Sequence, residues 1–127
     1  MAGERILVAE DNDKSLKLFR DVLEVSGFET LEATTGEQAI EFAIQHDPDL
    51  ILMDIRLSGM DGVAALHRLR EDERTASTPV IALTAQAMDG DRERFLEAGF
   101  NGYISKPVNV REFLAVVQRH CEGHGDG

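Results

Sequence analysis

Leu50-Ile51-Leu52-Met53-Asp54-Ile55 is a short apolar run that is broken by one acidic residue near its end. Continuous apolar stretches of this length are typical of strands in a parallel sheet that helices cover on both faces. Two further runs have the same character, Ile6-Leu7-Val8 and Val80-Ile81-Ala82-Leu83. We therefore expect these three segments to form the centre of one parallel sheet.

Two other segments predict the edges of that sheet. Glu29 to Ala33 mixes polar and apolar residues, and Gly102-Tyr103-Ile104-Ser105 is brief, which suits edge strands. Strand-like and helix-like segments alternate along the whole chain, a pattern that indicates parallel strands joined by crossover helices. The sequence thus predicts an α/β fold with a five-stranded parallel sheet.

Apolar residues at helical spacing predict five helices between and after these strands. Polar Asn12-Asp13 precedes the first of them, and Thr35 with Gln38 and Asn109 with Glu112 have the form of helix caps. Gly27, Pro48 and Gly99 follow segments that should end there. The apolar positions of the expected helices are Leu16, Phe19, Val22 and Leu23; Ala39, Ile40, Ala43 and Ile44; Val63, Leu66 and Leu69; Phe95 and Leu96; and Val110, Phe113, Leu114 and Val117.

Length and charge narrow the class of protein. With 127 residues and 43% hydrophobic content, we expect one domain over residues 1–127, with 122–127 frayed. No apolar run reaches membrane-spanning length and no signal-peptide layout follows Met1, so we expect a cytoplasmic protein. A formal net charge of -11 argues against direct binding of nucleic acid. The single cysteine, Cys121, has no disulfide partner in the chain.

Polar residues stand at the carboxyl ends of four expected strands. They are Glu10-Asp11 after the first, Asp54 at the third, Thr84 at the fourth and Lys106-Pro107 after the fifth. Taken singly, Asp11 is more often a helix cap, and Thr84 or Lys106-Pro107 a turn. Ligands of open parallel sheets bind beyond these strand ends, however. The combination therefore predicts carboxylates, a hydroxyl and an ammonium at one edge of the sheet.

Clustered carboxylates require positive charge nearby, because like charges repel strongly away from bulk water. Mg²⁺ prefers oxygen ligands, and one or two carboxylates typically bind it together with waters and a phosphate oxygen. Lys106 supplies a second, fixed positive charge. Asp54 would then be a carboxylate nucleophile in a site that can neutralise an incoming phosphoryl group.

Four motifs together resemble the CheY-like receiver domains of two-component response regulators: Glu10-Asp11-Asn12, Leu52-Met53-Asp54-Ile55, Leu83-Thr84-Ala85 and Lys106-Pro107. The resemblance extends from Arg5 to about Cys121. Three segments are also similar to stand-alone regulators of the DivK kind: the Glu10-Asp11-Asn12 opening, Leu50-Ile51-Leu52-Met53-Asp54-Ile55 and Tyr103-Ile104-Ser105-Lys106-Pro107. It implies a flavodoxin-like sheet in the order 2-1-3-4-5 with helices on both faces. It also implies a signalling switch rather than an enzyme, with self-phosphorylation from small phosphodonors and autodephosphorylation.

The resemblance implies a role for each residue of the expected site. Asp54 would be the phosphoacceptor. Asp11, Asp54 and the backbone carbonyl of Arg56 would bind Mg²⁺, and Glu10 would act on the ion mainly through water. Lys106 would pair with the phosphoryl oxygens, and the Lys106–Pro107 peptide bond would be cis.

The resemblance further implies a conformational switch. Thr84 would hydrogen-bond the new phosphoryl group, and Tyr103 would swing inward, although an aromatic that only packs on the core is the alternative. The surface of the fourth helix, fifth strand and fifth helix would change and bind a downstream kinase or adaptor. A histidine kinase or histidine phosphotransfer protein would donate the phosphoryl group. The side chains of Arg56 and Gln86 would modulate water access to the acyl phosphate.

One departure and three alternatives accompany this hypothesis. Ser58 stands where the family usually has proline, so the loop 57–62 should be freer. A Mg²⁺-dependent phosphohydrolase with an aspartate nucleophile needs an acid two residues after that nucleophile, where this chain has Arg56. A dinucleotide site would need Gly-x-Gly-x-x-Gly after the first strand, and the chain has Glu10-Asp11 there. A receiver domain excised from a hybrid histidine kinase would have the same chemistry in another context.

Overall fold

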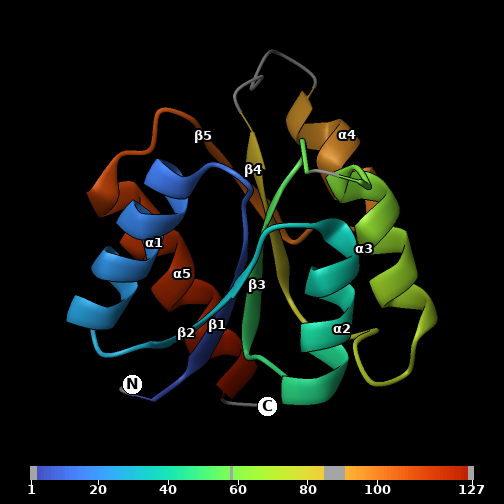
Figure 1. Ribbon diagram of the computed structural model, residues 1–127, viewed down its shortest axis with the longest axis horizontal. Coiled ribbons are helices and arrows are strands. Elements are labelled where there is room, and N and C mark those ends of the chain that lie inside the picture. Colours follow the sequence, from blue (N-terminus) through green and yellow to red (C-terminus); the bar gives the residue numbers. More distant parts are fainter. Residues whose placement is uncertain (1–2, 58, 85–90, 126–127) are drawn as a thin grey trace.

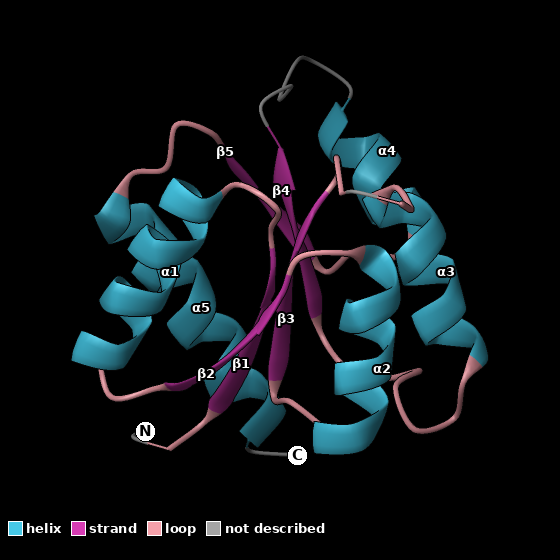
Figure 2. Cartoon of the chain, viewed as in Figure 1, coloured by secondary structure: helices cyan, strands magenta, loops and turns pink. Residues whose placement is uncertain are grey.

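The computed structural model describes residues 3–57, 59–84 and 91–125. It contains a 5-stranded parallel sheet in the order β2-β1-β3-β4-β5, with helices on both faces (Figures 1 and 2). The strands are β1 (Arg5–Ala9), β2 (Glu29–Ala33), β3 (Leu50–Asp54), β4 (Val80–Thr84) and β5 (Gly102–Ser105). The predicted fold class, strand order and edge strands are confirmed.

The central strands are buried as the apolar runs predict. Every residue of β3 and β4 is buried, because helices cover both faces of the sheet. The edge strands β2 and β5 each bury a single residue, Ala33 and Ile104. The register pairs Ala9 with Met53 and Thr84 with Ser105, so the carboxyl ends of the strands lie side by side.

The helices are α1 (Asp13–Val25), α2 (Gly36–His46), α3 (Gly62–Glu71), α4 (Asp91–Ala98) and α5 (Val110–Gly125). Asn12 caps α1, with its Oδ1 accepting from Ser15 N. The predicted caps at Thr35 and Asn109 are present: Thr35 Oγ1 accepts from Gln38 N, and Asn109 Oδ1 accepts from Glu112 N. The return bond of the second cap differs from the expected capping box. The Gln38 side chain accepts from the backbone N of Thr34 rather than from that of Thr35, one residue earlier.

The core has two halves, one on each face of the sheet (Figure 1). On one face α1 and α5 pack through the stacked rings of Phe19 and Phe113, whose centroids are 5.2 Å apart. On the other face lie α2, α3 and α4, and Phe95 is the buried aromatic of α4. Leu96 and Val110 were expected among the apolar helix positions, but each is 43% exposed. Leu96 follows Phe95 directly, so the helical turn of about 100° per residue directs it away from the sheet.

The last helix reaches into the segment that should fray. The backbone of α5 is helical through Gly125, and residues 126–127 lie outside the described part of the chain. Fraying of 122–127 therefore stays a prediction. None of the helices in the described ranges combines the length and apolar character that a bilayer crossing requires.

Candidate functional site

The carboxyl ends of β1, β3, β4 and β5 surround a pocket of about 230 Å³. Its lining consists of Glu10, Asp11, Asn12, Asp54, Ile55, Arg56, Thr84 and Lys106. The structure thus brings together the strand-end residues that the sequence singled out. Ser58, Ala85 and Gln86 lie outside the described residues, and their expected contributions stay predictions.

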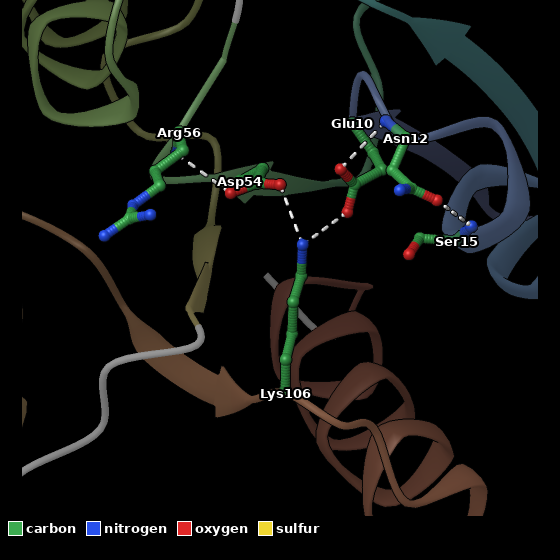
Figure 3. A network of polar contacts seen from close by, with 6 residues as sticks. All are labelled: Glu10, Asn12, Ser15, Asp54, Arg56 and Lys106. Atoms are coloured by element: carbon green, nitrogen blue, oxygen red, sulfur yellow. Dashed lines mark hydrogen bonds and ion pairs between the residues drawn. The ribbon is translucent and has the colours of Figure 1, made fainter.

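Lys106 connects the two buried acids of the pocket. Its Nζ donates to Glu10 Oε1 at 2.7 Å and to Asp54 Oδ2 at 2.8 Å (Figure 3). The side chains of Glu10 and Asp54 are 1% and 8% exposed, so these ion pairs are screened less than surface pairs. The Lys106–Pro107 peptide bond is cis, and Lys106 N donates to the carbonyl of Thr84 at 2.7 Å.

Asp54 is held at both carboxylate oxygens. It is the last residue of β3, and its Oδ1 accepts from the backbone N of Arg56 at 2.8 Å while Oδ2 accepts from Lys106. The Arg56 side chain is exposed and points away from Asp54 (Figure 3). The loop therefore presents the backbone of Arg56, not its guanidinium, to the acid group.

The pocket fits a hard divalent cation. Glu10, Asp11 and Asp54 each offer a carboxylate oxygen, and these oxygens lie within 4.8 Å of one another. The set contains oxygen donors only, which suits Mg²⁺. Asp11 is exposed whereas the other two are buried, so an ion held here would keep contact with water. Mg²⁺ normally retains several of its water ligands.

The pKa values of the buried acids diverge. Burial and a hydrogen bond with Asp54 raise the pKa of Glu10 to about 7. Burial acts to raise the pKa of Asp54 as well, but hydrogen bonds from Glu10, Lys106 and the Arg56 backbone lower it overall. Burial acts to lower the pKa of Lys106, and its bonds to Asp54 and Glu10 raise it overall. Asp54 therefore stays ionised, as a nucleophile must, and Glu10 is the acid of the pair that takes up a proton more readily.

This arrangement predicts how stability depends on pH in the absence of metal. The pKa of folded Glu10 lies above its ordinary value of 4.5, so the bound proton stabilises the fold fully below about 4.5, and this contribution is lost as the pH rises through about 7. We expect the unfolding midpoint in EDTA to fall between pH 5 and pH 8 by an amount on the order of a few degrees. Differential scanning fluorimetry across this range measures it.

Glu10→Gln is the matched variant, because it removes the titrating group and keeps its shape. The decline of the unfolding midpoint between pH 5 and pH 8 should be smaller in this variant. Added Mg²⁺ should stabilise the native chain more at pH 8 than at pH 5, because a ligand that binds only the folded state raises stability and needs ionised carboxylates. Equal pH dependence in the native chain and the variant would show that Glu10 does not titrate in this window.

Tyr103 lies apart from the carboxylates. It is half-buried on β5, with its ring centroid 6.2 Å from that of Phe95 on α4. It lines a second pocket, of about 390 Å³, together with residues of α4 and α5 that include Leu96, Glu112 and His120. The predicted switch residue thus faces the α4–β5–α5 surface.

The structure adds contacts of Glu10 that the sequence did not indicate. Its Oε1 accepts from Lys106 and its Oε2 accepts from Asn12 N at 3.2 Å, while its expected action on Mg²⁺ through water stays a prediction. Asn12, part of the Glu10-Asp11-Asn12 motif, lines the pocket. A Glu at a buried strand end beside a later Lys-Pro was the available signal. The spacing of these residues in the sequence does not predict which hydrogen-bond partner each side-chain oxygen takes.

Comparisons with known proteins place this geometry among signalling proteins. The sequence profile described as "Response regulator receiver domain" matches residues 6–118. The polar-differentiation response regulator DivK of Brucella ovis is 44% identical over 115 residues, which cover 91% of this chain and 94% of that protein.

Solved structures agree with the sequence comparison. The receiver domain of a sensor histidine kinase from Pseudomonas aeruginosa PAO1, with a magnesium ion coordinated in its active-site cleft, is 38% identical with a TM-score of 0.87 and covers 95% of this chain and 99% of its own. A CheY-like response regulator receiver domain protein from Methanospirillum hungatei JF-1 is 26% identical with a TM-score of 0.88, and the match covers 98% of both chains.

Proposed function

Because this chain belongs to the family of response regulator receiver domains, we propose that it is a single-domain response regulator that accepts a phosphoryl group on Asp54 in a Mg²⁺-dependent reaction. One observation carries this proposal. Lys106 Nζ lies 2.8 Å from Asp54 Oδ2 and 2.7 Å from Glu10 Oε1, in a pocket whose three acids can together hold a cation.

In the proposed reaction an ionised oxygen of Asp54 attacks phosphorus. A new P–O bond forms while the bond from phosphorus to the donor's histidine nitrogen breaks, and that nitrogen keeps the electron pair. Lys106 neutralises charge on the transferred group, which preorganised donors do well in a pocket of low polarity. A bound Mg²⁺ would add charge neutralisation at the phosphoryl oxygens. The donor is a histidine kinase or a histidine phosphotransfer protein.

Asp11, Asp54 and the backbone carbonyl of Arg56 would hold the ion. Glu10, whose oxygens accept from Lys106 and from the Asn12 backbone, would act on the ion mainly through water. The backbone carbonyl of Arg56 is a suitable metal ligand because the Arg56 backbone already lies beside Asp54. The arrangement makes the chain a switch whose charge changes, rather than an enzyme that turns over substrate. Self-phosphorylation and autodephosphorylation, modulated by the side chains of Arg56 and Gln86, belong to the same proposal.

The phosphorylated state would be transmitted through Thr84 and Tyr103. A phosphoryl group adds about -1.5 to -2 units of charge and recruits nearby donors, and Thr84 is buried at the end of β4 in the same pocket. Tyr103 lies two residues before Ser105, which pairs with Thr84 in the sheet. Its ring packs against Phe95. Movement of Tyr103 would alter the α4–β5–α5 surface, where a cytoplasmic kinase or adaptor would bind.

Incubation with acetyl phosphate, followed by mass spectrometry of the intact chain and its peptides, tests the proposal. We expect one added phosphoryl group on the peptide that contains Asp54, formed with Mg²⁺ and absent in EDTA. Label at another residue, or label of equal extent in EDTA, would contradict it. Steady turnover of p-nitrophenyl phosphate would instead support a phosphohydrolase, which lacks an acid here because Arg56 stands two residues after Asp54.

A second context is favoured by one comparison. The 38% identical structure from Pseudomonas aeruginosa is the receiver domain of a sensor histidine kinase, so the chain could act as a receiver within a hybrid kinase. The site chemistry would be unchanged. An immunoblot of source cells distinguishes the two contexts: a band near 14.0 kDa supports the single-domain protein, and a much larger band supports the hybrid.

A further inference from the structure

The loop that follows Asp54 passes between two helix-starting glycines. Gly62 is the first residue of α3 and Gly36 the first of α2, and both are buried. A Cβ atom at Gly62 would lie 2.5 Å from the carbonyl oxygen of Asp54 and 2.9 Å from Cα of Ile55. A Cβ atom at Gly36 would lie 2.9 Å from Cβ of Met60. Neither position has room for a side chain as the neighbours now stand.

The two close approaches differ in what would have to move. The Gly36 neighbour is Cβ of Met60, which its own backbone fixes, so a side chain at residue 36 would shift the loop as well. At Gly102, the first residue of β5, an added Cβ atom would lie 3.3 Å from Cδ1 of Ile81, the tip of a side chain that can give way. The Gly62 neighbours are the backbone of Asp54 and Ile55. That backbone is fixed, because Asp54 pairs with Leu83 in the sheet and Ile55 N donates to Leu83 O at 3.0 Å.

The backbone of Gly62 also holds the loop closed. Gly62 N donates to the carbonyl of Ile55 at 2.8 Å, which brings the start of α3 against the end of β3. Within this closed loop the Arg56 backbone N reaches Asp54 Oδ1 at 2.8 Å. The absence of a side chain at residue 62 therefore allows the geometry that orients the carboxylate.

We infer that Gly62 is a positioning residue for Asp54 and for the loop backbone at Arg56, an inference that rests on the proposed function. A side chain at residue 62 pushes either the backbone of Asp54 or the loop that carries Arg56, and each of these two residues carries an expected Mg²⁺ ligand. Residues that orient metal ligands from outside typically change metal affinity about 10- to 100-fold when altered.

Gly62→Ala tests the inference, with Gly102→Ala as the matched control at the start of β5, away from the carboxyl ends of the strands. Mg²⁺ affinity is measured by isothermal titration calorimetry, and Asp54 labelling is measured with acetyl phosphate at saturating Mg²⁺ for each variant. We expect Gly62→Ala to bind Mg²⁺ about 10- to 100-fold more weakly and to label more slowly even when saturated. Gly102→Ala should stay close to the native chain in both measurements.

A destabilising variant far from the site distinguishes the positioning role of Gly62 from a purely structural one. Val117 lies in the other half of the core, so Val117→Ala should lower the unfolding midpoint while leaving Mg²⁺ affinity intact. If Gly62→Ala matches Gly102→Ala in Mg²⁺ affinity and labelling, the inference is wrong. If it stays unfolded even in sucrose, which favours compact states, Gly62 serves folding and the inference is also wrong. A native chain that binds Mg²⁺ but takes no label would instead overturn the proposed function.

Discussion

Lys106→Met is expected to slow the labelling of Asp54 by acetyl phosphate about 10²- to 10³-fold, the usual cost of losing one preorganised donor to a developing charge. The same variant should bind Mg²⁺ more tightly. In the metal-free protein the Lys106 ammonium bridges Glu10 and Asp54, so its charge opposes a second cation at the same oxygens. Rate and metal affinity should therefore change in opposite directions, which calorimetry and timed mass spectrometry measure.

Lys17→Met is the control for loss of a lysine. Lys17 pairs with Asp21 at 2.9 Å on the exposed face of α1, where an ion pair contributes little to stability. Its labelling rate and Mg²⁺ affinity should stay native. If both quantities fell together in Lys106→Met, Lys106 would serve mainly to hold the pocket in shape, and its assigned role toward the phosphoryl group would be wrong.

The loss of Lys106 should also destabilise the metal-free fold. Removing one partner of a buried ion pair typically costs about 3–5 kcal/mol. The cost should be smaller here, because Glu10, whose pKa is already raised to about 7, can keep its proton and hydrogen-bond Asp54. Urea denaturation in EDTA at pH 6 and pH 8 measures this difference, and the loss of stability should be larger at pH 8.

The fold was predictable because its signals are local. Continuous apolar runs such as Leu50 to Met53 require cover on both faces, and only central strands of a parallel sheet receive it. The edge strands were recognisable from their polarity or brevity. Leu96 was misassigned because α4 has only 8 residues, too few for periodicity to separate its buried face from its exposed face.

The site was predictable at the level of which residues meet, and less so at the level of which atoms bond. The end of a parallel strand faces one edge of the sheet, so Asp54 and Lys106 had to converge although 52 residues separate them. The Lys106–Glu10 pair joins residues that are 96 positions apart in the sequence. Whether Lys106 donates to Glu10 or to water depends on atomic packing, which a sequence pattern does not give. Gly62 gave no signal of its own, because its role is the space it leaves for the Asp54 backbone.

Asp54→Asn should abolish labelling by acetyl phosphate, since an amide oxygen is not an ionised nucleophile and the other acids of the pocket are placed differently. The fold should persist, because an asparagine oxygen can still accept from the Arg56 backbone N where Asp54 Oδ1 now does. Asp61→Asn is the matched control. Asp61 caps α3 from the same loop, and asparagine caps helices equally well, so labelling should stay native.

The same variant tests the coupling between the two buried acids. Asp54 raises the pKa of Glu10 through a hydrogen bond and through its charge, so Asp54→Asn should lower the pKa of Glu10 toward the ordinary value. Lys106 then keeps Glu10 as its charged partner, and the decline of the unfolding midpoint between pH 5 and pH 8 in EDTA should shrink. Carboxylate titration followed by NMR measures the pKa directly. An unchanged Glu10 pKa would mean that burial alone raises it. In the labelling experiment, a phosphoryl group on Asp11 of this variant would show that Asp54 is not the phosphoacceptor.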